Sequence, residues 1–169
     1  MSKDIILIIG ASSDIGIDLI KNIDEDALIL AHYNSSNKGL SELSNKIDKE
    51  LVMIKADLSI EDETISMIEG IENKYGIPNK IIHLAATKFE NIRFKDVKLD
   101  DFQNDLEISL KSLIIILNKF LPKLAKEKQG KVVCMLSSVV LNIPPKALTQ
   151  YTTIKYALLG LVKSLASEY

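Results

Sequence analysis

Short unbroken runs of apolar residues alternate along the chain with longer stretches in which apolar residues recur every three or four positions. An unbroken run is typical of a strand buried on both faces, and the wider spacing is typical of an amphipathic helix. Strands that alternate with helices imply right-handed crossovers, so we expect an α/β fold: a doubly wound parallel sheet, order 3-2-1-4-5, with helices on both faces. The predicted strands cover residues 5–9, 27–31, 51–55, 80–86 and 130–136.

Helices are predicted between these strands and after the last one. The longest is expected at about 100–126. Its leucines recur every three or four residues and form one apolar face, and Ile114, Ile115 and Ile116 extend the apolar surface beyond that face. Such a helix either lies deep in the core or packs a second face against a partner chain. Pro122 is expected to bend or restart it. The other helices should follow residue 16 and cover about 38–49, 60–75 and 149–168, all within a single domain of residues 1–169.

Composition narrows the class of protein. Hydrophobic residues make up 47% and charged residues 26%, which is typical of a soluble globular chain. With 21 basic and 23 acidic residues, a net charge of −2 and no basic run, nothing indicates a nucleic-acid partner. The first apolar run is too short for a signal peptide or a membrane span, so we expect a cytoplasmic protein with no membrane partner.

The cysteine and the histidines do not indicate a metal site. The single Cys134 cannot form an internal disulfide, and its apolar neighbours suggest a buried thiol. His32 and His83 stand far apart in the sequence, and no second cysteine or histidine accompanies either of them. We therefore predict no metal, and we expect His83 to be a hydrogen-bonded residue within the sheet.

A segment with glycines at both ends, residues 10–16, follows the first strand directly and opens a helix. This layout suits a phosphate held on the N–H groups of a helix N-terminus. An ordinary strand-to-helix turn explains the same residues equally well.

The loop after the second predicted strand bears on the choice of cofactor. In a dinucleotide-binding unit this strand end faces the adenosine ribose, where an acidic residue selects NAD. No Asp or Glu occurs between Ala31 and Ser41. NADP is therefore favoured over NAD, although small polar residues make up many loops. The side chains able to donate to a 2′-phosphate are Asn34, Ser35, Ser36 and Lys38.

A hydroxyl, a phenol and an amine stand at the end of the fifth strand and on the last helix. Tyr151 and Lys155 are four residues apart, about one helical turn, so their side chains point the same way. An ammonium close to a phenol favours the phenolate and lowers its pKa from about 10. A serine beside that phenol, Ser138, would polarise a substrate carbonyl.

Together these residues resemble the short-chain dehydrogenase/reductase family, over essentially the whole chain. The likeness consists of the glycine motif, Asp57 after the third strand, the small residues at 83–86, and a serine followed by a tyrosine four residues before a lysine. Ser138 precedes Tyr151 by 13 residues, the spacing usual for 3-oxoacyl-carrier-protein reductases. The resemblance implies a Rossmann-type fold.

The resemblance also implies an activity: NADPH-dependent hydride transfer to a ketone or an acyl thioester such as a 3-oxoacyl substrate. Tyr151 would be the general acid, Lys155 would hold the nicotinamide ribose and depress the pKa of Tyr151, and Ser138 would bind the developing oxyanion. Asp57 and Leu58 would flank adenine, although Asp57 could instead cap the next turn. The other residues implied at the cofactor are Gly10, Ser12, Ser13, Ile15, Gly16, Ala85 and Ala86.

Three residues depart from the family pattern. Asp14 replaces the middle glycine, and a carboxylate about 5 Å from a phosphate repels it by roughly 1 kcal/mol in a water-like dielectric. Asp14 could instead turn outward and serve the helix N-terminus. Ser109 stands where the family carries an Asn in its proton relay, and serine is shorter. His83 begins a motif that looks more like the sugar-nucleotide epimerase and dehydratase branch.

Family members continue beyond the position of Tyr169 with further strands and a substrate lid. The resemblance therefore implies a C-terminally incomplete domain, either a fragment or a naturally short form, with the fifth strand left as an open edge. The alternatives to a reductase are a sugar-nucleotide-modifying relative and a non-catalytic, degenerate member. We expect a homodimer or homotetramer assembled through the helices at 100–126 and 149–168.

Overall fold

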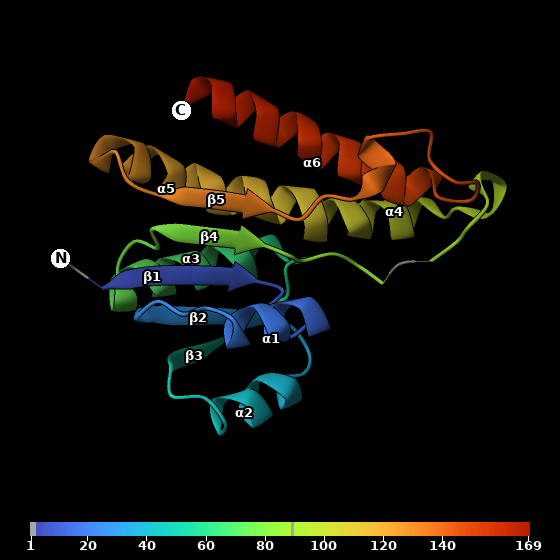
Figure 1. Ribbon diagram of the computed structural model, residues 1–169. Helices are drawn as coiled ribbons and strands as arrows, with labels where there is room; N and C mark the ends of the chain where they lie inside the picture. Colours follow the sequence, from blue (N-terminus) through green and yellow to red (C-terminus); the bar gives the residue numbers. More distant parts are fainter. Residues whose placement is uncertain (1–2, 89) are drawn as a thin grey trace.

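The computed structural model describes residues 3–88 and 90–169, and it contains one five-stranded parallel sheet in the order β3-β2-β1-β4-β5 (Figure 1). The parallel sheet and the strand order predicted from the sequence are confirmed. The strands are β1 (Asp4–Ile9), β2 (Ala27–Tyr33), β3 (Glu50–Lys55), β4 (Lys80–His83) and β5 (Lys131–Cys134).

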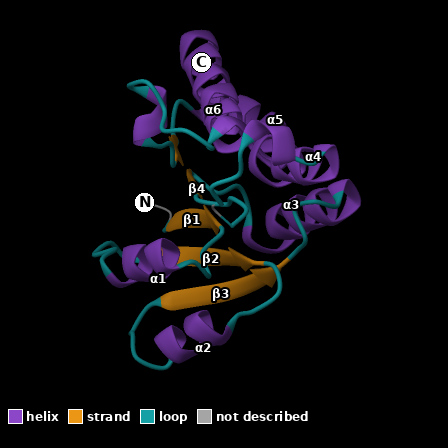
Figure 2. Ribbon diagram, turned by 90° about the vertical axis from the view of Figure 1, so that its right-hand side faces the viewer, coloured by secondary structure: helices purple, strands orange, loops and turns teal. Residues whose placement is uncertain are grey.

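Helices cover both faces of this sheet (Figure 2). One hydrophobic cluster joins the sheet to α1 and α2, and the other joins it to α3, α5 and α6. The helices are α1 (Asp14–Lys21), α2 (Lys38–Ser44), α3 (Glu61–Tyr75), α4 (Leu99–Leu106), α5 (Ser112–Glu127) and α6 (Thr149–Glu168), with a π-helical turn at Glu107–Lys111 and short 3₁₀ turns η1 (Phe94–Asp96) and η3 (Ser138–Val140).

Strand β1 shows why the first apolar run is unbroken. Leu7 and Ile9 pack into the cluster of α3, α5 and α6, while Ile6 and Ile8 pack into the cluster of α1 and α2. All four side chains are at most 1% exposed. Because neither face of a central strand meets water, no position along it can be polar without losing burial energy.

The second helix is shorter than the sequence predicts. It ends at Ser44 instead of continuing to Lys49. The Lys49 ammonium instead donates to the main-chain oxygens of Ile20 and Lys21, at 2.8 and 2.7 Å. These carbonyls lie at the C-terminus of α1, where a helix leaves its last acceptors without partners and attracts a cation. The predicted fourth and fifth strands also end earlier, at His83 and Cys134.

The long helical segment is continuous but not uniform. Its middle part, Glu107–Lys111, is π-helical and separates α4 from α5. Pro122 lies inside α5, so the helix does not restart at that residue, and the alternative of a bend there stays a prediction. Proline removes only one N–H donor from the ladder, and the buried face around Phe120 and Leu124 holds this turn in place.

His83 lies in the sheet as predicted, but one of its ring nitrogens lacks a hydrogen-bond partner in the described part of the chain. It lies in register between Ile9 and Cys134 and is 1% exposed. Its Nε2 has no hydrogen-bond partner within residues 3–88 and 90–169, so the prediction of a hydrogen-bonded side chain is wrong for this atom. Burial, followed by the nearby charges of Lys155 and His32, lowers the pKa of His83 to about 3.

This buried histidine should make the protein sensitive to acid. The folded-state pKa of about 3 lies below the ordinary 6.5, so below pH 6.5 the unfolded chain binds a proton that the folded chain does not. Stability should therefore fall by up to about 1.4 kcal/mol per pH unit as the pH drops from 6.5 towards 3. His83→Asn should lessen this loss, measured as urea-unfolding free energies at pH 7 and pH 5. An equal loss in both proteins would contradict the assignment.

Candidate active site

The carboxyl ends of the parallel strands gather the predicted site residues along one edge of the sheet. Gly10 follows β1, Asn34 follows β2, Asp57 lies beyond β3 and Ala85 beyond β4. Ser138 opens η3 beyond β5. In an open parallel sheet this edge is where ligands bind.

The turn between β1 and α1 depends on glycine at both of its ends. Gly10 has φ +81°, and a Cβ there would lie 2.8 Å from the Ala85 main-chain nitrogen. A Cβ at Gly16 would lie 2.5 Å from the Ala11 carbonyl oxygen. Both contacts are closer than real Cβ atoms come to backbone, so the turn packs main chain against main chain.

The first turn of α1 carries the remaining residues of the glycine motif. Ser13 is the N-cap: its hydroxyl accepts from the Gly16 N–H at 3.2 Å and donates to the Gly10 carbonyl at 2.8 Å. Asp14 is exposed in the first helical turn, which fits the outward orientation considered above. Ser12 and Ile15 are exposed beside it. The helix N-terminus therefore remains open to solvent.

His32 holds this turn from the other side, a role that the sequence did not reveal. Its Nδ1 accepts from the Gly10 N–H at 3.1 Å, and its Nε2 donates to the Ala56 carbonyl at 3.0 Å. The two contacts fix the tautomer, because Gly10 offers a donor and Ala56 an acceptor. Burial lowers the pKa of His32. In the sequence, the one sign of this role is that His32 follows the apolar run of the second predicted strand.

The residues expected near adenosine differ in how far they are exposed to solvent and in the hydrogen bonds that they make. The Asp57 carboxylate accepts from the Ser59 N–H at 2.9 Å and from its hydroxyl at 2.6 Å, and these bonds, with one to Asn34, hold the pKa of Asp57 below its ordinary value. Asp57 thus organises the turn before α3. Leu58 is 5% exposed and packs in the core, so its main chain alone faces the edge of the sheet. The exposed residues are Asn34, Ser35, Ser36, Lys38 and Ala86.

Lys155 and Tyr151 lie together on α6, as their spacing predicts. Lys155 is 5% exposed, and its Nζ donates to the Met135 carbonyl at 2.8 Å. The same Nζ lies 5.7 Å from the centre of the Tyr151 ring. Burial lowers the pKa of the Lys155 amine. The turn η3, which begins at the exposed Ser138, packs against α6, the helix that carries Tyr151 and Lys155.

Ser109 lies within the π-helical turn and is 3% exposed. This turn packs against α6. Single π-helical turns occur frequently at functional sites, because the extra residue shifts the side chains that follow it. Ser109 thus belongs to a segment that packs against the helix carrying Tyr151, and its place in a proton relay stays a prediction.

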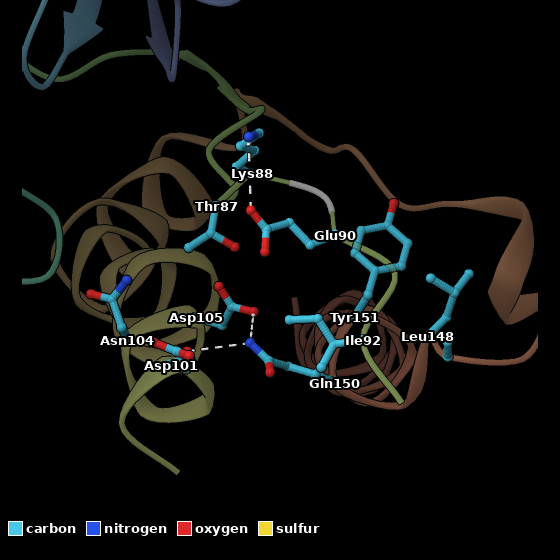
Figure 3. A pocket seen from close by; sticks show the side chains of 11 residues that line it. Thr87, Lys88, Glu90, Ile92, Asp101, Asn104, Asp105, Leu148, Gln150 and Tyr151 are labelled. Atoms are coloured by element: carbon cyan, nitrogen blue, oxygen red, sulfur yellow. Dashed lines mark hydrogen bonds and ion pairs between the residues drawn. The ribbon is translucent and has the colours of Figure 1, made fainter. Parts of the chain in front are cut away.

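A pocket of about 230 Å³ lies beside Tyr151 (Figure 3). Its lining comes from α4, from the segment after β4 and from the start of α6 with the residues just before it: Thr87, Lys88, Glu90, Ile92, Asp101, Asn104, Asp105, Ala147, Leu148, Gln150 and Tyr151. Gln150 reaches across it, and its Nε2 donates to the Asp105 carboxylate. Sequence reasoning singled out neither residue, because 45 positions separate them.

Among the residues that the structure describes, no group of three or more His, Cys, Asp or Glu side chains is placed to hold a metal ion. In the same part of the chain, no helix is both long and apolar enough to cross a membrane.

A model of the short chain dehydrogenase family matches residues 4–169. An NADPH-dependent pterin aldehyde reductase of Arabidopsis thaliana is 26% identical over 165 residues, covering 96% of this chain and 68% of the relative. A 3-oxoacyl-[acyl-carrier-protein] reductase of Buchnera aphidicola is 23% identical over 168 residues, covering 99% of this chain and 68% of the relative. The chain thus spans about two thirds of the length of these relatives.

Solved structures show the same fold. A metagenomic short-chain oxidoreductase in complex with NADP has a TM-score of 0.88 at 21% identity, covering 98% of this chain and 76% of that one. A short chain dehydrogenase/reductase from Saccharomyces cerevisiae has a TM-score of 0.82 at 21% identity, covering 98% of this chain and 66% of that one. At these identities the likeness establishes the fold alone. Because the family model spans nearly the whole chain, the protein belongs to the short chain dehydrogenase family, whose members are NAD(P)-dependent oxidoreductases.

Proposed function

We propose that this chain carries the catalytic site of an NADPH-dependent reductase that acts on a ketone or an acyl thioester such as a 3-oxoacyl substrate. The observation that carries the proposal is the assembly of Tyr151, the buried Lys155 and the turn beginning at Ser138, at the sheet edge that also bears the glycine turn. Two relatives support it, since one is named as an NADPH-dependent reductase and the other as a 3-oxoacyl reductase.

The residues at the glycine turn fit a dinucleotide. Gly10 and Gly16 leave no Cβ between the turn and the neighbouring main chain, and the N-terminus of α1 has N–H groups without helical acceptors. Ser12, Ser13, Asp14 and Ile15 would surround the pyrophosphate through their main chain. The Ser13 hydroxyl is already bonded to Gly10, so its contribution is to shape the turn.

Each catalytic side chain has a distinct task in the proposed reaction. When bound, the nicotinamide supplies the hydride. Tyr151 donates a proton to the carbonyl oxygen, and Ser138 donates a hydrogen bond to the same oxygen as negative charge develops there. The Lys155 ammonium has three N–H donors, and Met135 takes one of them. The ammonium would also hold the ribose hydroxyls, and Ser109 would connect this assembly to water.

Removal of the Tyr151 hydroxyl should abolish proton transfer. Tyr151→Phe should lower kcat by at least about 100-fold, because a positioned general acid contributes about 10²–10⁴-fold. NADPH should still bind, as followed by the fluorescence of the cofactor. Tyr75→Phe serves as the matched control, because Tyr75 lies at the C-terminal end of α3. Full turnover by Tyr151→Phe would refute the role of Tyr151 as proton donor.

Selection of NADPH is proposed to rest on the loop after β2, where Asn34, Ser35 and Ser36 are exposed and uncharged. Ser35→Asp would bring a carboxylate towards the 2′-phosphate. The repulsion should weaken NADPH binding by about tenfold and affect NADH much less. Fluorescence titration with both cofactors tests this, and Asn73→Asp on the exposed part of α3 is the control. Tighter binding of NADH by the unmutated protein would overturn the proposed selectivity.

We also propose that the chain forms a homodimer or homotetramer through α4, α5 and α6. Ile114 on α5 remains 43% exposed although it belongs to a strongly apolar helix. Ile114→Glu should therefore produce monomers in sedimentation experiments, because an interfacial charge without a partner is costly. Ile60→Glu, at a residue that is 46% exposed and precedes α3, should leave the mass unchanged. A monomeric unmutated protein would contradict the proposal.

A further inference from the structure

The chain just before α6 has an unfavourable backbone conformation. Ala147 has φ +67°, in the left-handed region that favours glycine. In the described part of the chain, one other non-glycine residue has a positive φ, Lys128. Lys128 is the C-cap of α5, where this conformation is common. Ala147 precedes a helix instead of ending one, so its conformation has no such explanation.

Two buried polar atoms without partners flank Tyr151. Within the described residues, the buried side-chain nitrogens and oxygens that lack a hydrogen-bond partner are His83 Nε2, Gln150 Oε1 and Thr152 Oγ1. Gln150 and Thr152 are the direct neighbours of Tyr151. An unpaired buried atom is unfavourable, as is a left-handed alanine. Such features persist only where the surrounding contacts fix the conformation, and they gather at functional sites.

Contacts with two distant segments fix the start of α6. The Ile92 N–H, in the segment after β4, donates to the Ala147 carbonyl at 2.9 Å. The Gln150 Nε2 donates to the Asp101 carbonyl at 3.3 Å and to the carboxylate of Asp105, which is 9% exposed. Gln150 therefore joins α6 to α4 (Figure 3). The N-cap residue of α6 makes no side-chain cap, so these contacts determine where the helix begins.

The placement of Gln150 governs the direction of Tyr151. Consecutive helical residues project about 100° apart. Figure 3 shows Gln150 extending towards Asp101 and Asp105, while the ring of Tyr151 extends away from them. A rotation of the first turn by about 10° would move an atom about 6 Å from the helix axis by about 1 Å. A misplacement of about 1 Å at a reacting group can lower a rate by about 100-fold.

We propose that Gln150 and Asp105 are positioning residues for Tyr151. Their hydrogen bond resists rotation of the first turn of α6 and so keeps the phenol hydroxyl in line with the substrate carbonyl. The inference rests on the proposed reductase function, in which Tyr151 donates the proton. Neither Gln150 nor Asp105 takes part in the reaction itself. Loss of their contact should therefore lower kcat and leave the binding of NADPH at the β1–α1 turn unchanged.

Two substitutions of Asp105 separate the hydrogen bond from the charge. Asp105→Asn keeps an acceptor for Gln150, so kcat for acetoacetyl-coenzyme A should stay within about twofold. Asp105→Leu removes the acceptor and should lower kcat at least about tenfold, with the KM little changed, because the contact acts on the reacting group. The Kd of NADPH, from cofactor fluorescence, should stay within about twofold in both variants. Equal losses of kcat in the two variants would overturn the proposal.

A double variant tests whether the two residues act through each other. Gln150→Met should lower kcat as much as Asp105→Leu, and the double variant should fall no further, because both changes break one contact. Losses that multiply would contradict the inference. Gln103→Met, at an exposed residue of α4, is the matched control and should keep full kcat. If Asp105→Leu fails to fold, the comparison of Gln150→Met with Asp105→Asn replaces it.

Amide hydrogen exchange tests the contact without turnover. The Thr152 N–H donates to the Leu148 carbonyl at 2.8 Å, in the first turn of α6. Gln150→Met should speed exchange at Thr152 at least about tenfold, because the first turn loses its attachment to α4. The last two turns of α6 should exchange as before, since Lys155 still ties the helix to the end of β5.

The exchange result also separates the two proposals. Unchanged exchange at Thr152 in Gln150→Met would overturn the positioning role. If exchange at Thr152 accelerates as expected but the unmutated protein reduces no substrate, the contact fixes the first turn and the proposed reductase function fails.

Discussion

The contact between Gly10 and the end of β4 is the constraint on which the site depends. A Cβ at Gly10 would overlap the main chain of Ala85, so only glycine lets the two strand ends meet. On the other side, His32 accepts the Gly10 N–H and bonds to Ala56 beyond β3. The turn is thereby fixed between the ends of three other strands. Helix α1 begins from this fixed turn, and its open N-terminus points to the same edge of the sheet.

A second contact fixes the catalytic half. The buried ammonium of Lys155 donates to the carbonyl of Met135, just beyond β5, and so ties α6 to the sheet. Only 5% of this residue is exposed, and burial lowers the pKa of its amine. Tyr151, one helical turn earlier, takes its position from the same attachment. The proposed nucleotide turn and the proposed acid are thus held by separate contacts at one sheet edge, and β4 lies between them.

Local patterns predicted most of this arrangement. A strand such as β1 could be predicted because burial on both faces makes its sequence an unbroken apolar run. Tyr151 and Lys155 could be paired because their spacing puts them on one helix face. Contacts between distant residues were not visible. Gly10 and His32 are 22 positions apart, and Asp105 and Gln150 are 45 apart. The π-helical turn around Ser109 also escaped prediction, because a shift in the hydrogen-bond ladder leaves the apolar spacing almost unchanged.

A crystal structure with bound NADP⁺ tests the central claim most directly. We expect the pyrophosphate on the N–H groups of the first turn of α1, the 2′-phosphate near Asn34, and the nicotinamide ribose within hydrogen-bond distance of the Lys155 ammonium. The Gly10 contact with Ala85 should persist in the complex. A nucleotide bound away from this edge, or crystals that take up none at millimolar concentration, would contradict it.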